Sequence, residues 1–349
     1  MADLVDRFRL VRARRRWMRA PSPWRQSGLF GLVLALLAIA VVVVAILERR
    51  GSVRDAEIVE YAAARRTDPV TLVLDLARTR PVVVLGDVAG APGPKRLAAD
   101  VIAALAAGPG LDYVAIEVGS DLQPVIDRYL DAAAEDASAL VSQSRSTGGG
   151  GAASTFLGIY RQVRQLNVEL GADRRIRIIA IDSPDWPPVG AVAPSRLLPL
   201  FAARDAWMME RLMDRIFERD ETSRVLVFVD GLRALNASLR LAASRSASAD
   251  MPLLARRLRS ALPGRVAAVI VDSPATASGT AWVGYRGSRL DRLLRTTAAG
   301  LPLAIPLRPA LPVTTGDITV TGPPGLDIGL SPAGALLSDL ADGYVRLPN

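Results

Sequence analysis

The chain contains no cysteine and no histidine among its 349 residues. Without cysteine there is no disulfide and no thiolate metal site, so cysteine usage leaves the cellular compartment open. Without histidine the protein lacks the commonest metal ligand and the side chain that ordinarily titrates near neutral pH. These absences exclude an ordinary zinc site and every catalytic triad that uses a histidine base.

Lysine is almost missing too, because Lys95 is the single lysine and every other basic side chain is an arginine. We interpret this preference as a compositional bias of the genome. The formal net charge is +8, and residues 1–26 hold eight arginines against Asp3 and Asp6, a net of +6. Residues 27–349 therefore contribute only +2. A basic tail on a nearly neutral domain is not a nucleic-acid-binding face, so we expect no nucleic-acid partner.

Polar side chains are absent from residues 28–47, GLFGLVLALLAIAVVVVAIL. As a helix, this run would be about 30 Å long, which matches the hydrocarbon core of a bilayer. We predict a transmembrane helix over 27–48 with membrane lipid as its partner. The arginines before the helix predict a cytoplasmic tail over 1–26 and a periplasmic location for 51–349, in a single-pass protein of the inner membrane. The run is too long for a signal peptide and lacks a cleavage site of small residues.

Strand-like and helix-like segments alternate through the rest of the chain, after a helical connector expected over 49–79. Short apolar, β-branched runs predict strands, and longer periodic runs between them predict helices. The predicted strands are 81–85, 112–118, 175–182, 224–230 and 265–272, and the predicted helices are 95–107, 121–135, 155–170, 195–219 and 250–262. This alternation is typical of an α/β domain with a mostly parallel sheet flanked by helices on both faces, which we assign to 80–349.

Two local patterns refine this prediction. Ser120 and Gln123 have the spacing of a capping box, which would start the second helix. Residues 142–154 are rich in glycine and serine and predict a flexible loop.

Acidic residues stand at or near the carboxyl end of each predicted strand. Along the chain they are Asp87, Glu117, Asp182, Asp230 and Asp272. The carboxyl ends of parallel strands meet at one edge of the sheet, which is where ligands of α/β proteins bind. Carboxylates gathered there repel one another unless cations or protons intervene.

The first four of these acids are the candidate catalytic residues. Together they could hold a hard cation such as Mg²⁺ or Ca²⁺ through oxygen ligands, or share protons for acid–base chemistry. Ser183 also stands at a strand end, but it lacks the Gly-x-Ser-x-Gly elbow and a histidine base, so we predict that it lines the site and is not a nucleophile. Lys95 follows GAPGP at a strand-to-helix turn, yet Pro92 and Pro94 remove amide donors that a phosphate loop needs.

Several motifs follow one another in a fixed order between residues 80 and 347. They are LGDVAG (85–90), VAIEVGSDLQPVIDRYL (114–130), IAIDSP (179–184), RDAWM (204–208), VFVDGLRALN (227–236) and LLSDLADGYVRL (336–347). In this order they resemble the ChaN-like, erythromycin-esterase-like superfamily, which also includes haem-binding and Tiki-type members. The resemblance implies a site of glutamates and histidines that handles metal or haem or performs hydrolysis. It also places Arg204, Asp205, Gln123 and Asn236 beside that site.

The chain departs from this family where the chemistry would lie. Asp87 stands where the family has its first glutamate, and the family histidines would fall near Ala89 or Gly90 and near Arg233. Glu117 is retained. Because arginine carries a permanent charge on a planar fork, we predict that Arg233 points into the carboxylates and pairs with Glu117 or Asp87.

The resulting prediction is a divergent member of the superfamily without the family histidines, acting as a membrane-anchored, non-catalytic module. It would bind or scaffold an envelope protein or a small ligand, with no cofactor, since arginine cannot act as a base near neutral pH. The alternative is a divergent hydrolase or an enzyme dependent on a divalent cation, Mg²⁺ or Ca²⁺, which uses the acidic residues. Haem is disfavoured without histidine or cysteine.

Overall fold

The computed structural model describes only part of the 349-residue chain. The described residues are 36–37, 39–40, 55–141, 152–184, 194–241, 251–273, 283–284, 290, 293–294, 302–308, 313, 319–320, 328–331 and 335–348. The chain divides into two compact units, Met1–Ala56 and Glu57–Asn349.

The predicted basic tail over 1–26 lies outside the described residues, as does the predicted transmembrane segment over 27–48 apart from four helical residues. Within the described ranges, no helix is both long enough and apolar enough to cross a bilayer.

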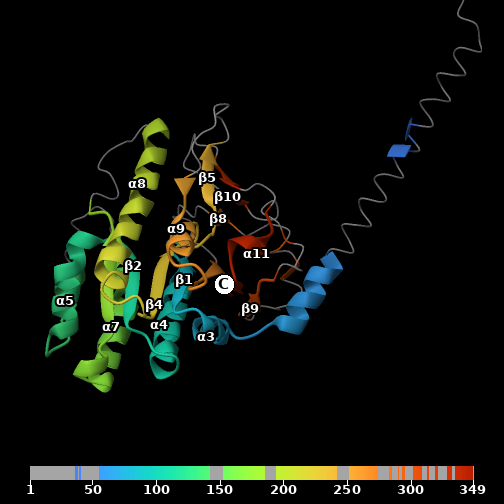
Figure 1. Cartoon of the computed structure of the whole chain (residues 1–349). Coiled ribbons are helices and arrows are strands. Elements are labelled where there is room, and N and C mark those ends of the chain that lie inside the picture. The colour runs from blue at the N-terminus through green and yellow to red at the C-terminus, as the bar shows by residue number, and fades with distance from the viewer. Residues whose placement is uncertain are drawn as a thin grey trace, which may run out of the picture. The chain divides into compact units, whose positions relative to one another are not determined.

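The second unit is built on a sheet that is parallel except at one edge (Figure 1). Its described strands run in the order β3 (Arg177–Asp182), β2 (Tyr113–Gly119), β4 (Val225–Asp230), β1 (Val82–Asp87), β7 (Val266–Asp272), β12 (Gly343–Arg346) and β9 (Leu303–Pro306). Strand β9 alone among these pairs antiparallel to its neighbour, β12. Each predicted strand corresponds to one of these strands, so the mostly parallel sheet is confirmed.

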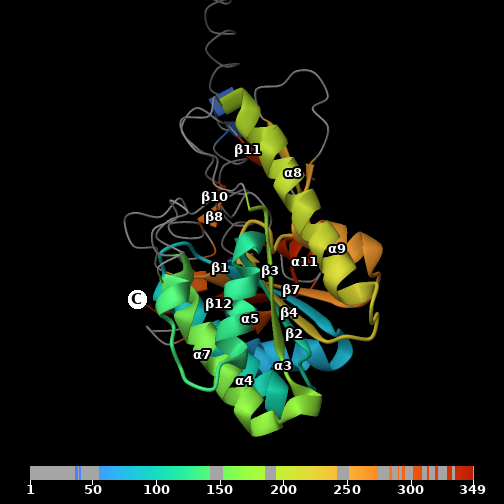
Figure 2. The same ribbon diagram turned by 90° about the vertical axis from the view of Figure 1, so that its left-hand side faces the viewer.

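Helices cover both faces of this sheet because its central strands are apolar on both sides. Strands β1 and β7 are buried along almost their whole length. Helices α3 (Pro69–Thr79), α4 (Pro92–Ala107), α5 (Gln123–Asp131) and α7 (Ala152–Leu170) share one hydrophobic core with one face, and Figure 2 shows α4, α5 and α7 packed together there. Helices α8 (Pro194–Leu212) and α9 (Leu254–Ala261) share another core with the opposite face. The predicted α/β class with helices on both faces is therefore confirmed.

The domain begins earlier than the predicted boundary at residue 80. Helix α3 starts at an N-cap, where Asp68 Oδ1 accepts hydrogen bonds from the amides of Val70 and Thr71 at 2.9 and 3.1 Å. Its apolar side buries Leu72 and Val73 in the core. From residue 57 onward the predicted connector over 49–79 is thus part of the compact unit, because α3 packs against the sheet.

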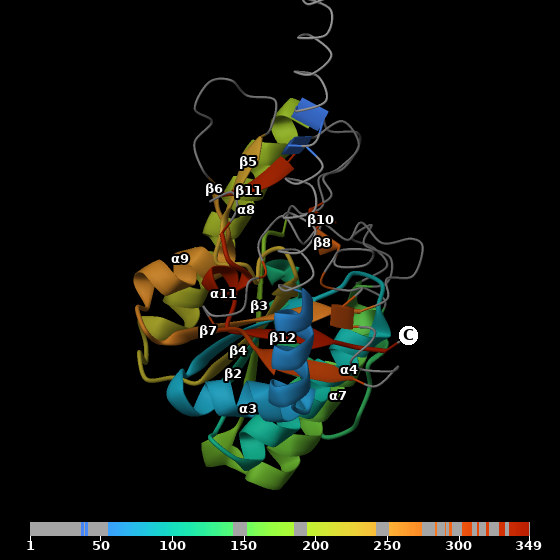
Figure 3. The same ribbon diagram turned by 90° about the vertical axis from the view of Figure 1, so that its right-hand side faces the viewer.

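Smaller sheets and a short helix complete the unit. A second sheet contains β11 (Ile328–Ser331), β5 (Ser238–Leu241) and β6 (Met251–Pro252), and a third pairs β10 (Thr319–Val320) with β8 (Val283–Gly284). Helix α11 (Leu337–Leu340) packs beside β7 and β12, in a core that includes Ile270 and Tyr344 (Figure 3).

Two local predictions need correction. Ser120 opens a 3-10 turn, η1 (Ser120–Leu122), without a side-chain cap, so the predicted capping box is wrong. The side chain of Gln123 turns to the edge strand β3 instead. The predicted flexible loop over 142–154 lies outside the described residues up to 151, and its last three residues already belong to α7.

Candidate functional site

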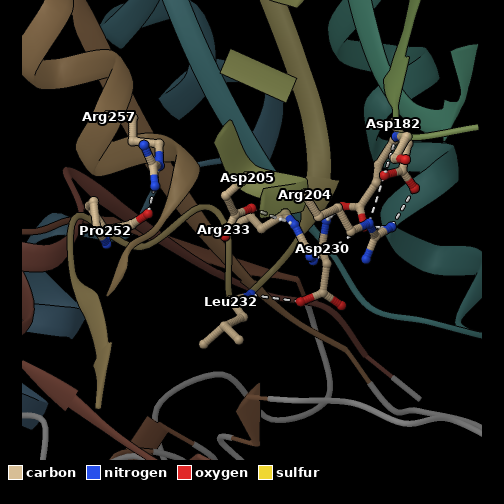
Figure 4. A network of polar contacts seen from close by, with 10 residues as sticks. Asp182, Arg204, Asp205, Asp230, Leu232, Arg233, Pro252 and Arg257 are labelled. Carbon is tan, nitrogen blue, oxygen red and sulfur yellow. Dashed lines mark hydrogen bonds and ion pairs between the residues drawn. The ribbon is translucent and has the colours of Figure 1, made fainter. Parts of the chain in front are cut away.

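Eight charged side chains gather where β1, β2, β3 and β4 end, and we call them the charge cluster. They are the acids Asp87, Glu117, Asp182, Asp205 and Asp230 and the cations Lys95, Arg204 and Arg233. Strand ends supply four of the acids, as predicted, whereas α8 supplies Arg204 and Asp205. Figure 4 shows the two arginines between the acids that surround them.

Arg204 joins two strands through one guanidinium group. Its Nε donates to Asp182 Oδ1 at 2.6 Å, and its Nη2 donates to Asp182 Oδ2. The same Nη2 donates to Glu117 Oε1 at 2.6 Å. The planar fork suits this paired contact with a carboxylate, and it ties the ends of β2 and β3 to α8.

Arg233 approaches Glu117 from the segment that follows β4. Its Nη1 lies 3.2 Å from Glu117 Oε1, and its Nε lies 2.8 Å from Asp205 Oδ1. The second contact is an ion pair rather than an aligned hydrogen bond, because neither atom has a partner with hydrogen-bond geometry. The predicted burial of Arg233 and its pairing with Glu117 are confirmed, with 4% of the residue exposed.

Glu117 is the hub of the charge cluster. Besides contacting both arginines, its Oε2 accepts a hydrogen bond from the backbone amide of Asp230 at 2.7 Å. Burial alone would raise the pKa of Glu117, but Arg233 and then Arg204 hold this pKa below its usual value. Glu117 therefore stays ionised at neutral pH, and its charge is compensated inside the protein.

Of the two partners predicted for Arg233, Glu117 is the one it contacts, whereas Asp87 pairs with Lys95. Lys95 Nζ lies 2.7 Å from Asp87 Oδ2 and donates to the carbonyl of Val88 at 3.0 Å. Burial raises the pKa of Asp87 to about 7, although Lys95 acts against that rise. Asp87 is thus a carboxyl group that exchanges its proton near neutral pH.

Asp230 lies directly beside Asp87, because the two residues are register partners on β4 and β1. Its Oδ1 accepts a hydrogen bond from the amide of Leu232 at 2.9 Å (Figure 4). Burial, together with the negative charge of Glu117, raises the pKa of Asp230 to about 6. Asp87 and Asp230 therefore form an adjacent pair of carboxyl groups that titrate close to neutral pH.

The other two acids of the charge cluster are also shifted. Burial raises the pKa of Asp182, against the opposing effect of Arg204, and burial raises the pKa of Asp205, against Arg233. The site thus has an arginine-paired part around Glu117 and a titrating part around Asp87.

Three predicted site residues have other roles. Asn236 Nδ2 donates to the carbonyl of Asp339 at 2.8 Å, so it connects the segment after β4 to the α11 region. The prediction that Asn236 lies beside the site is therefore wrong, because this residue contacts α11 and not the charge cluster. Gln123 bonds to the backbone of β3. Ser183 adjoins the cluster through its backbone amide, which donates to Asp182 Oδ1 at 2.8 Å.

The sequence-based prediction missed the role of Lys95, because it considered this residue only as part of a phosphate loop. Its status as the single lysine was the available signal. Within the described ranges, no group of three acidic residues is arranged to hold a metal ion. The acidic oxygens of the charge cluster instead contact guanidinium, ammonium and backbone amide groups.

Comparison with known proteins identifies the fold. No protein-family model and no curated protein matches the sequence. A solved succinoglycan biosynthesis protein aligns at a TM-score of 0.55 and 8% identity, over 84% of this chain and 97% of its own. A Bacillus cereus protein aligns at 0.52 and 11%, over the same shares of the two chains. An erythromycin esterase mutant in its open conformation aligns at 0.51 and 10%, over 80% of this chain and 93% of its own.

These alignments show that the chain shares the α/β fold of these solved proteins, one of which is an erythromycin esterase. The resemblance inferred from the ordered motifs is confirmed at this level. Because identities of 8–11% carry no information about activity, the chemistry of this chain is argued from its own residues.

Proposed function

We propose that this chain is a membrane-anchored envelope protein whose ChaN-like domain binds a partner protein or a small ligand without turning it over. The observation that supports this most is the compensation of Glu117 by Arg204 and Arg233. A carboxylate held by two guanidinium groups is a poor proton acceptor and has little charge left for a metal ion. Arginine itself releases no proton near neutral pH.

The anchor and the location are part of the same proposal. Residues 28–47 are apolar throughout, and the arginines before them favour an N-terminus in the cytoplasm. The domain would then stand on the periplasmic side of the inner membrane. The arginine-rich tail also suits the anionic headgroups of the cytoplasmic leaflet.

A Glu117→Gln variant tests the binding role. If Glu117 is structural, the variant loses about 3–5 kcal/mol of unfolding free energy, because each arginine loses one of its two buried acidic partners. The full chain, purified in detergent, should hydrolyse no substrate in a panel of carboxylic esters, with or without added Mg²⁺ or Ca²⁺. Glu135→Gln is the matched control, since Glu135 forms an exposed pair with Arg161 and should change stability little.

The second candidate is a divergent hydrolase or an enzyme dependent on a divalent cation. The observation that favours it is the neighbouring pair Asp87 and Asp230. Two adjacent carboxyl groups with pKa values of about 7 and about 6 are suited to act as acid and base. The comparison with an erythromycin esterase supplies the ester class for the panel. If the wild-type chain hydrolyses an ester and this activity disappears in Glu117→Gln, Asp87→Asn or Asp230→Asn, the chain is a hydrolase and the proposal of a non-catalytic binding role is wrong.

A further inference from the structure

Lys95 stands out because it is the single lysine in the chain and is buried. Every other basic residue is an arginine, and only 8% of Lys95 is exposed. Lysine is rarely buried unless it is paired, because its ammonium group is strongly hydrated in water. A compositional preference for arginine that spares this one position indicates that the position needs an amine.

Three contacts hold this amine at the tip of β1. Nζ lies 2.7 Å from Asp87 Oδ2, donates to the Val88 carbonyl at 3.0 Å, and stands 5.9 Å from the ring centroid of Phe156 on α7. The other ion pairs of the charge cluster use arginine forks. Asp87 is therefore matched with the one kind of basic side chain that can give up a proton and act as a nucleophile.

The ion pairs of the charge cluster restrict the charge of a ligand that could bind at Lys95. Among the described residues, each of the three cations of the charge cluster already pairs with at least one acid, so an anionic ligand would have to compete with those acids. A cation aimed at Asp87 would meet the ammonium group of Lys95. An uncharged electrophile remains, and the electrophile that an amine binds reversibly is a carbonyl carbon.

We propose that Lys95 binds an uncharged aldehyde or ketone as an imine, with Asp87 as the group that moves the proton. The inference rests on the proposed binding role and names the chemistry of one ligand. The amine of Lys95 forms the C–N bond, and the carbonyl oxygen leaves as water. Of the two hydrogens in that water, one comes from the amine and one from the Asp87 carboxyl, which leaves a protonated imine beside an Asp87 carboxylate.

Two features of the pair support this step. The side chains of Lys95 and Asp87 keep 9% and 12% of their surface exposed, so the pair is buried but not fully closed to solvent. The pKa of Asp87, raised by burial to about 7, lets this carboxyl group give and take a proton near neutral pH.

Reductive trapping tests the inference, since the chain carries one lysine. The full-length Arg128→Lys variant in detergent provides an exposed reference lysine in the same molecule, on α5. Butanal and sodium cyanoborohydride are added near neutral pH, and alkylation of each lysine is followed by peptide mass spectrometry. We expect Lys95 to react at least about tenfold faster than the reference lysine, because Asp87 stands beside its amine to transfer the proton. An equal or slower rate at Lys95 would show that this residue serves only as a buried counter-ion of Asp87, and it would overturn the inference.

The Asp87→Asn change, made in the same Arg128→Lys background, tests the proton transfer. Trapping at Lys95 should fall about tenfold relative to the reference lysine, and an unchanged ratio would remove Asp87 from the step. If this variant does not fold, the trapping ratio of the parent variant across the pH range serves instead, and a ratio that does not change with pH would count against Asp87. Failure of trapping leaves the ester panel and the Glu117→Gln result unaffected, so the inference and the proposed function can fail separately.

Discussion

Asp87 and Asp230 bind protons more tightly in the folded protein than free aspartate does. Burial raises their pKa values from the usual 3.8 to about 7 and about 6. Between the usual and the raised values the folded state holds more protons than the unfolded state, so stability falls as pH rises through this window. Glu117 has the opposite effect, because its lowered pKa makes stability fall in acid, below its usual value of 4.5.

The free energy of unfolding should therefore decrease between about pH 5 and about pH 7, by about 1 kcal/mol per pH unit. Urea denaturation of the full chain at several pH values measures this slope. Asp87→Asn removes the group with the higher pKa and should flatten the curve near neutral pH. Asp75→Asn, which changes an exposed residue, should keep the wild-type slope. A slope unchanged in Asp87→Asn would contradict the raised pKa of Asp87.

Arg204 contributes geometry as well as charge to the charge cluster. One guanidinium group contacts both oxygens of Asp182 and one oxygen of Glu117, while only 8% of the residue is exposed. A lysine ammonium is a compact point charge on a flexible stem, so it cannot reproduce these parallel contacts.

Arg204→Lys should consequently lower the free energy of unfolding by about 2 kcal/mol. Arg204→Met should lower it by about 3–5 kcal/mol, because this change removes the cation paired with Asp182 and leaves Glu117 with Arg233 alone. Arg161→Lys, in an exposed pair with Glu135, is the control and should change stability by less than about 0.5 kcal/mol. Chemical denaturation of the three variants measures these differences. Equal effects at positions 204 and 161 would show that the fork geometry is unimportant.

At the level of secondary structure, β3 is the edge strand of the sheet among the described residues, and two side chains bond to its outer edge. Gln123 donates to the carbonyl of Ile178 and accepts from the amide of Ala180, both at 2.8 Å. Asn167 bonds to the carbonyl and amide of Ile176 at 2.9 and 2.7 Å. Residues 176, 178 and 180 alternate along the strand, so their backbone groups face the same side. The two amide side chains thus occupy a row that would otherwise invite pairing with another chain.

Gln123→Met keeps the volume of this side chain and removes its hydrogen bonds. The variant should lose about 1–3 kcal/mol of stability, because a buried backbone donor and acceptor lose their partners. Hydrogen exchange at the amide of Ala180 should accelerate relative to that of Ile179, which belongs to the inner side of the strand pair with β2. Gln165→Met changes an exposed residue of α7 and should leave both rates unchanged. Unaltered exchange at Ala180 in Gln123→Met would contradict this role.

At the level of the whole molecule, the features that could be predicted from the sequence are those that follow from repeated patterns of residues. Apolar runs located the strands of the parallel sheet, and the acids at their ends predicted where Asp87, Glu117, Asp182 and Asp230 would meet, because parallel strands end at one edge. The partners of these acids were harder to predict. A fork such as Arg204 reaches two strands far away in the sequence, and this contact depends on how α8 crosses the sheet.

Local patterns also misled where a side chain had a stronger long-range partner. Gln123 has capping-box spacing, but its side chain makes two hydrogen bonds to the backbone of β3 and a third to Asp127 on its own helix. Helix α3 looked like a connector because sequence cannot show that its apolar face packs on the sheet. Lys95 looked like an incomplete phosphate loop, although its partner is seven to eight residues away at the end of β1.

The proposed orientation in the membrane can be tested with the cysteine-free chain as a natural background. Ser22→Cys places one thiol in the predicted cytoplasmic tail, and Ser260→Cys places one on an exposed position of α9. In intact spheroplasts, a membrane-impermeant maleimide should label only Ser260→Cys, because the arginines before residues 28–47 favour retention of the tail in the cytoplasm. Ser22→Cys should react after detergent permeabilisation, which confirms that its thiol is present. Labelling of Ser22→Cys in intact spheroplasts, with Ser260→Cys protected until permeabilisation, would show the opposite orientation. Release of the chain from membranes by alkaline carbonate would show that residues 28–47 do not anchor it in the bilayer.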